Sequence, residues 1–192
     1  MKEDEQPLRQ AIELEAAAQQ ALLRGDAERS HALFHAAVER YRASWEAPGP
    51  RAFGRLVRLL KAAVLADEGG HAAAYVREAL GEGCDSPPSC YALALALLVQ
   101  GDDTAAVPAI EGMRTGGEGD ALARTADALA ALAHGERDAY ARAVEAIVAD
   151  FTARDVHLTG VAFADTAVVL ERLAAPRGMA ARPASSLMPV LG

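Results

Sequence analysis

The sequence predicts an all-α fold, and three observations carry this prediction. Strong helix formers dominate the chain, alanine above all. Apolar residues recur at helical spacing in segments of about 12 to 20 residues, and glycine or proline separates one segment from the next. The period-2 alternation typical of a strand occurs only over residues 91–95, inside a run of helix formers.

Composition limits the classes of protein to which the chain can belong. Its 192 residues, 52% of them hydrophobic, predict a single globular domain over 1–192. The formal net charge of −8 disfavours nucleic-acid binding, which needs a basic surface. The longest apolar run, 91–99, is too short to span a bilayer. The acidic start of the chain predicts no signal peptide, so we expect a cytoplasmic protein.

Helix starts and stops predict about nine helices, most of them in consecutive pairs. Gly25 ends the first helix and Asp26 caps the second, while Gly69-Gly70 are expected to turn the chain within the second pair. The expected pairs cover about 6–46, 51–80, 89–113 and 120–152, followed by a terminal helix over about 159–174 and a tail.

The turn glycines recur along the chain, which suggests a structural repeat. Gly25, Gly70, Gly101 and Gly135 are separated by 45, 31 and 34 residues. The residues around Gly25 have the layout of a helical hairpin. Small residues, Ala18 and Ala37, stand in its first and second helix, Asp26 directly follows the turn, and Phe34 is the aromatic residue of the second helix.

This layout resembles a degenerate tetratricopeptide-like repeat protein. The tryptophan of that family is absent, because its positions hold Leu14, Leu59, Cys90 and Arg124. The resemblance implies a short solenoid of antiparallel helix pairs, with the first helix of each pair lining a concave groove that binds a protein or peptide. It implies no cofactor.

A second resemblance concerns the C-terminal third of the chain. Residues 135–140, the amphipathic and apolar helices that follow, Arg177-Gly178 and the tail 186–189 form a layout similar to that of some all-helical bacterial immunity proteins. This resemblance implies a partner that is a cognate toxin.

A basic stripe is the candidate partner-binding site. Arg51, Arg55 and Arg58 follow i, i+4, i+7 spacing, with Lys61 near the edge of the stripe. The apolar face of the same helix is expected opposite them, so we place the stripe away from the core. It could bind acidic side chains or a peptide carboxylate, or it could be an ordinary solvated face.

The remaining histidines, carboxylates and cysteines show no pattern typical of a catalytic, cofactor or metal site. Glu28, His31, His35 and Glu39 share one side of a helix, but a second set of metal ligands is missing. Asp155, His157 and Asp165 lack a nucleophile, so we interpret Asp155 as a helix cap and His157 as a loop or interface residue. We expect Cys84 and Cys90 to be reduced thiols in a cytosolic protein.

These observations favour a non-enzymatic protein-interaction module. Its partner is expected to be a protein or peptide, and the basic stripe would suit an acidic one. The oligomeric state stays open. An enzyme should show polar residues converging in a pocket, whereas the expected inner faces hold alanine and leucine. The alternatives are a bacterial immunity protein or a small helical enzyme or ligand-binding protein. The expected core residues are Leu14, Phe34, Leu56, Leu60, Leu93, Leu97, Leu132, Val144, Ile147 and Leu170.

Overall fold

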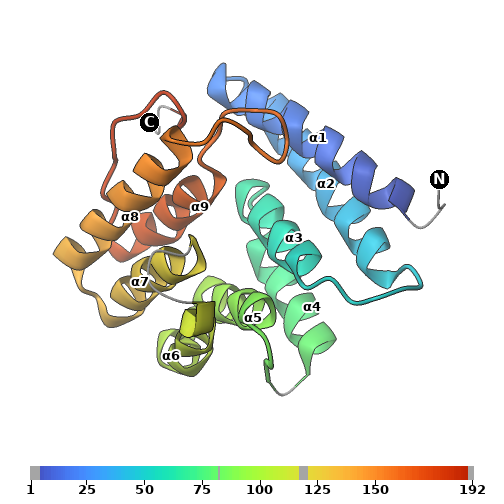
Figure 1. The fold of residues 1–192 in the computed structure, drawn as a ribbon. Helices are drawn as coiled ribbons and strands as arrows, with labels where there is room; N and C mark the ends of the chain where they lie inside the picture. The colour runs from blue at the N-terminus through green and yellow to red at the C-terminus, as the bar shows by residue number, and fades with distance from the viewer. Residues whose placement is uncertain (1–4, 82, 117–120, 190–192) are drawn as a thin grey trace.

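The computed structural model describes residues 5–81, 83–116 and 121–189. Over these residues the chain forms nine α-helices and no β-strand, which confirms the all-α prediction (Figure 1). The helices are α1 (Gln6–Leu23), α2 (Ala27–Glu46), α3 (Gly54–Leu65), α4 (Gly69–Leu80), α5 (Pro87–Gln100), α6 (Asp103–Gly112), α7 (Ala121–His134), α8 (Arg137–Thr152) and α9 (Asp165–Ala174). Short 3-10 helices, η2 (Met113–Gly116) and η3 (Ala175–Arg177), directly follow α6 and α9.

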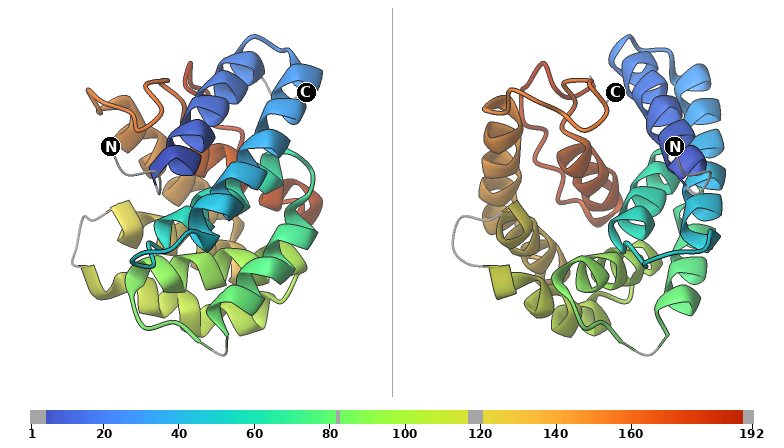
Figure 2. Two further views of the ribbon diagram at one scale, coloured as in Figure 1. Left: turned by 90° about the vertical axis from the view of Figure 1, so that its right-hand side faces the viewer. Right: turned by 45° about the vertical axis from the view of Figure 1, so that its right-hand side comes forward.

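The first eight helices pack in the order in which they occur along the chain. Each contacts the next, and α5 also contacts both α3 and α7. The right-hand view of Figure 2 shows these helices following a curve, with α9 inside it. Because α9 contacts α3, α7 and α8, the C-terminal helix covers part of the inner side of the curved array.

One type of turn closes α1, α3, α5 and α7. A residue with positive φ stands at each turn, and the amide of the acidic residue after it donates to a carbonyl five residues earlier, at 2.8 to 3.0 Å. This is the Schellman arrangement, which satisfies carbonyl groups left without a partner at a helix end. The left-handed residues are Gly25, Asp67, Gly101 and Gly135, and the acidic residues are Asp26, Glu68, Asp102 and Glu136.

The second of these turns corrects a prediction. Gly69 and Gly70 do not turn the chain, because α4 already begins at Gly69. Asp67 takes the left-handed conformation instead, with φ of 55°, which aspartate tolerates better than most residues. The turn residues Asp67, Gly101 and Gly135 therefore follow one another at a constant interval of 34 residues, and Gly25 precedes Asp67 by 42.

Two helices are shorter than expected. The terminal helix starts at Asp165 instead of Thr159, because Gly160 has a φ of 72° and the amide of Ala164 donates to the carbonyl of Leu187. Residues 153–164 consequently form a loop. The third helix starts at Gly54 instead of Arg51. The expected start of the seventh helix, Asp120, lies outside the described residues.

The predicted core is confirmed at eight of its ten positions. Leu14 and Leu93 are only partly buried, while the other eight residues are buried in one cluster. The buried positions of α1 form a stripe that passes beside Leu14, namely Ala11, Glu15, Ala18, Gln19 and Ala21. The inner side of α1 thus carries a carboxylate.

The cysteines correct a second prediction. Cys84 and Cys90 form a disulfide across the loop before α5, with a Cα–Cα distance of 4.9 Å, instead of two thiols. The intervening sequence brings them together because α5 begins at Pro87 and places Cys90 one turn into the helix.

In the described part of the chain, no helix combines the length and the apolar character needed to cross a bilayer.

Candidate functional site

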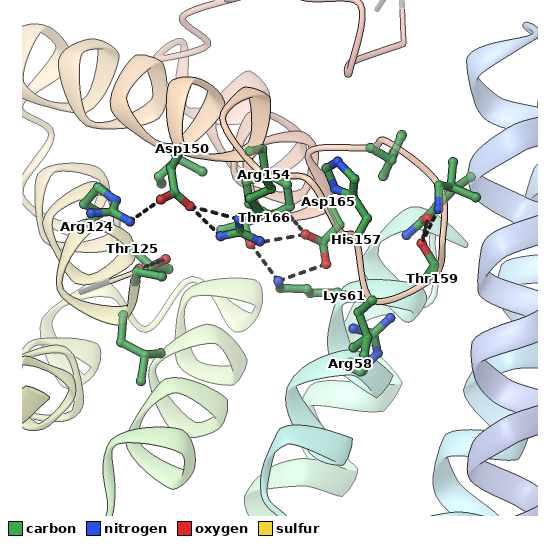
Figure 3. A pocket seen from close by; sticks show the side chains of 18 of the residues that line it. Arg58, Lys61, Arg124, Thr125, Asp150, Arg154, His157, Thr159, Asp165 and Thr166 are labelled. Atoms are coloured by element: carbon green, nitrogen blue, oxygen red, sulfur yellow. Dashed lines mark hydrogen bonds and ion pairs between the residues drawn. The ribbon is translucent and has the colours of Figure 1, made fainter. Parts of the chain in front are cut away.

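A pocket of about 240 Å³ lies on the inner side of the curved array, where α9 and the loop 153–164 meet the earlier helices. Side chains from α1, α3, α5, α7, α8 and α9 line it (Figure 3). Many of these side chains are polar or charged, which corrects the expectation that the inner faces hold alanine and leucine. The charged residues among them are Arg58, Lys61, Arg124, Asp150, Arg154 and Asp165.

The structure divides the predicted basic stripe into two parts. Arg51 is exposed, with its guanidinium 5.6 Å from the centre of the Trp45 ring. Arg55 is partly buried and donates to the carbonyl of Ser44 at 2.6 Å. Arg58 and Lys61 line the pocket, so the expectation that the whole stripe faces away from the core is wrong. The cause is tertiary, because α1 and α9 supply carboxylates that allow these two cations to be buried.

Arg58 belongs to a buried cluster with Glu15 of α1 and Tyr41 of α2. Its Nη2 donates to Glu15 Oε2 at 2.6 Å, and its Nε donates to the Tyr41 hydroxyl at 2.7 Å. The Tyr41 hydroxyl and Gln19 Nε2 also donate to the Glu15 carboxylate. Burial raises the pKa of Glu15 above its usual value although Arg58 opposes the shift, and the charge of Asp165 raises it further. This cluster joins the first three helices on their inner side.

Lys61 belongs to a second buried cluster, with Asp165 and Thr166 at the start of α9. Its Nζ lies 3.1 Å from Asp165 Oδ2 and 2.7 Å from Thr166 Oγ1. Burial would lower the pKa of Lys61, but Asp165 raises it above its usual value. Burial would likewise raise the pKa of Asp165, but Lys61 and Arg58 lower it below its usual value. Both groups are therefore held in their charged forms.

The short distance between Lys61 and Thr166 invites comparison with a nucleophile and its general base. A lysine acts as a base only when its amine is neutral. Here the neighbouring Asp165 keeps the amine protonated, so that Lys61 donates to the Thr166 hydroxyl and cannot accept its proton. This geometry suits anchoring of α9 better than activation of a hydroxyl group.

The mouth of the pocket is formed by the end of α8 and the loop 153–164. Arg154 donates through Nε and Nη2 to Asp150 Oδ2, and Arg124 of α7 pairs with the other oxygen of this carboxylate. The guanidinium of Arg154 also lies 3.9 Å from the centre of the Phe151 ring. Thr159 donates to Gln19 Oε1 at 2.6 Å, which ties the loop to α1.

The other sequence candidates are not brought together. Asp155 is exposed in the loop and caps no helix, because α9 starts at Asp165. His157 stacks on Phe151, with ring centres 6.3 Å apart, as expected of a loop residue. His31 and His35 are both exposed, and His35 pairs with Glu68 at the start of α4. The described residues contain no group of three or more side chains suited to a metal ion.

Sequence reasoning missed Glu15 and Gln19, two almost fully buried polar residues. A signal was available for Glu15, since Ala11, Glu15 and Ala18 follow i, i+4, i+7 spacing and therefore share one face of a helix. A carboxylate on an otherwise apolar stripe needs a buried partner. The sequence does not indicate that the partner is Arg58.

In comparisons with known proteins, the chain matches no protein family, no curated protein and no solved structure.

Proposed function

We propose that this protein is a non-enzymatic interaction module that binds a partner protein at the mouth of the pocket. The observation that supports this proposal is a pair of exposed apolar side chains on the loop 153–164. Val156 is 82% exposed and Leu158 is 67% exposed, whereas the other large hydrophobic residues in the described part of the chain are at least partly buried. Exposed apolar side chains beside a hollow are typical of protein-binding surfaces.

The loop that carries these two side chains is held in place from both sides. The hydrogen bond from Thr159 to Gln19 ties it to α1, and the stacking of His157 on Phe151 ties it to α8. The pairing of Arg154 with Asp150 holds its first residues. A loop that is already ordered loses little conformational entropy on binding, which favours an interaction surface at this position.

The charged clusters in and beside the pocket support a non-enzymatic role. Lys61 is protonated and paired with Asp165, and the Glu15 carboxylate accepts hydrogen bonds from three side chains. A catalytic acid or base must exchange a proton with a substrate, and these groups are engaged with one another. They hold α1, α3 and α9 together around the pocket.

The resemblance to tetratricopeptide-like proteins also supports a binding role. Repeated turns at an interval of 34 residues and the sequential packing of helices suit a helical-hairpin array. In such an array the inner side usually receives the partner, but here α9 contacts α3, α7 and α8 on that side. We therefore place the partner at the pocket mouth instead of along a groove.

Site-specific photocrosslinking tests this proposal. A photoreactive amino acid at position 158 should crosslink a protein of defined mass in native cells, while one at Ala105, an exposed residue of α6, should not. The double substitution Val156→Ser/Leu158→Ser should abolish binding of the identified protein, measured by pull-down without crosslinking, and should not lower the melting temperature. Equal crosslinking from both positions would refute the proposed surface. A toxin as the captured protein would select the immunity-protein alternative.

We include a cytoplasmic location in the proposal, and the disulfide provides its test. Cytosolic thiols are generally kept reduced, whereas secreted and periplasmic proteins keep their disulfides. Alkylation of thiols in intact cells should therefore modify both Cys84 and Cys90 if the protein is cytoplasmic. Complete protection of both residues would instead place the chain in an oxidising compartment.

A further inference from the structure

We propose that the pocket receives a carboxylate group of the partner, adjacent to an apolar side chain, and that Arg154 and Arg58 donate to it. This inference rests on the proposed function, because it names the chemistry that the pocket mouth would recognise. It combines the charge of the pocket lining, the hydrogen-bonding state of the arginines and the apolar residues beside them.

The lining of the pocket has more basic than acidic side chains, although the chain as a whole is acidic. Four described lining residues are basic and two are acidic. The excess remains if Arg124 is not counted. There are then three basic side chains, those of Arg58, Lys61 and Arg154, against two acidic ones, those of Asp150 and Asp165. Glu15 contacts Arg58 from α1 but is not part of the lining. A ligand in the pocket thus meets a locally basic wall.

The arginines differ from the lysine in the hydrogen bonds that they have left to donate. Arg154 uses Nε and Nη2 on Asp150, and Arg58 uses Nε on Tyr41 and Nη2 on Glu15. Within the described residues, neither Nη1 atom has an acceptor. Lys61, by contrast, is engaged by Asp165, Thr166 and the face of the Tyr91 ring. Arg58 and Arg154 therefore each keep an Nη1 group that can donate to a ligand.

The pocket already holds carboxylates of its own chain, which indicates the chemistry that it accepts. Asp150 and Asp165 line the wall, each paired with a basic side chain. These two negative charges would repel a dianionic phosphate more strongly than a single carboxylate. An arginine also binds a carboxylate through geometrically matched N–H groups. A monoanionic carboxylate is therefore the ligand group that fits best.

Apolar side chains beside the arginines add a second requirement. Phe151, Leu158 and Val161 line the same pocket as Arg154. Leu158 is also one of the two exposed apolar residues of the loop. The group bound by Arg154 should therefore have an apolar neighbour, as in a partner segment in which an acidic residue or a terminal carboxylate adjoins a leucine-like side chain.

N-acetyl-leucine is the minimal probe, and its uncharged amide is the matched control ligand. Each compound is titrated into the protein while the Nε–Hε resonance of Arg154 is followed by NMR. N-acetyl-leucine should shift this resonance, and the amide should leave it unchanged. Inorganic phosphate should bind more weakly than N-acetyl-leucine. Equal shifts with the amide, or tighter binding of phosphate, would overturn the assignment of a carboxylate.

Arg154→Gln is the test variant, because this residue lies near the surface and its loss leaves the buried clusters intact. This substitution should lower the affinity for N-acetyl-leucine at least about tenfold, which is the effect of losing one charge-assisted hydrogen bond. Arg142→Gln removes an exposed charge of α8 that does not line the pocket, and should bind like wild type. Arg154→Lys, which keeps the charge without the planar donor pair, should restore only part of the affinity.

The same variants separate this inference from the proposed function. If the photoreactive amino acid at position 158 crosslinks a partner and that partner binds Arg154→Gln as tightly as wild type, the carboxylate assignment fails and the interaction surface stands. If N-acetyl-leucine binds through Arg154 but no protein is crosslinked at position 158, the carboxylate site stands and the protein-binding proposal fails.

Discussion

Lys61 of α3 lies 3.1 Å from Asp165, the first residue of α9, and this contact joins residues that are 104 positions apart in the chain. Both side chains are largely shielded from solvent, at 10% and 13% exposure. The pair attaches the C-terminal helix to the inner side of the curved array and forms part of the wall of the pocket.

Breaking this pair from one side should be costly. Asp165→Asn or Lys61→Met should each lower the free energy of unfolding by about 3 to 5 kcal/mol, because one buried charge loses its partner. The double variant should lose less than the sum of the two, as measured by urea denaturation. Arg172→Met, in an exposed pair with Asp67, is the control and should cost less than about 1 kcal/mol. Additive effects at Lys61 and Asp165 would contradict a direct interaction.

Two carboxylates of the buried clusters should give opposite pH dependences. The pKa of Asp165 is below its usual 3.8, so its contribution to stability is present above pH 3.8 and is lost as the pH falls further. The pKa of Glu15 is above its usual 4.5, so its contribution is fully present below pH 4.5 and is lost as the pH rises through the higher, folded-state pKa.

Urea denaturation across this pH range measures both contributions. Asp165→Asn should flatten the loss of stability in the acid range, and Glu15→Gln should flatten the loss above pH 4.5. Parallel pH profiles for wild type and Glu15→Gln would show that the Glu15 pKa does not change on folding.

Glu171 should hold the C-terminal tail against α9. Its almost fully buried carboxylate accepts from the Tyr140 hydroxyl at 2.9 Å and from the amides of Ala181 and Arg182 at 3.0 and 2.7 Å. Glu171→Gln replaces one acceptor with a donor, and should cost about 1 to 3 kcal/mol and expose residues 179–189 to limited proteolysis. Glu145→Gln, at an exposed position of α8, should leave the tail protected.

Core leucines should respond to truncation very differently from the loop leucine. Leu60→Ala and Leu97→Ala should each cost about 2 to 5 kcal/mol, because both side chains are buried. Leu158→Ala should change thermal stability by no more than about 0.5 kcal/mol, because this side chain is exposed. If the two core variants melted at the wild-type temperature, the assigned core would be wrong.

The turn at Asp67 should accept glycine and resist a β-branched residue. With φ of 55°, Asp67→Gly should be close to neutral, whereas Asp67→Val should cost about 1 to 2 kcal/mol. Thermal denaturation of the two variants measures the difference. Equal melting temperatures would mean that this residue has no left-handed requirement.

Local rules were enough to predict most helices of this protein from its sequence. The Asp26 side chain accepts from the amide of Arg29, and α2 begins at Ala27 as that cap predicts. Gly101 and Gly135 end α5 and α7 for the same local reason, the ease with which glycine adopts positive φ. Where two signals competed, as at Asp67 and Gly69-Gly70, local rules predicted a turn but not its residue.

Only the tertiary structure decided which charged residues are buried. Helical spacing puts Arg58 and Arg51 on one stripe, yet Arg51 is exposed and Arg58 pairs with Glu15, 43 positions away. The loop 153–164 and the position of α9 depend on similarly distant contacts, such as that between Thr159 and Gln19. A hydrogen bond within a turn involves residues a few positions apart and leaves a mark in the sequence. The burial of a charge depends on a partner that only the packing of whole helices brings near.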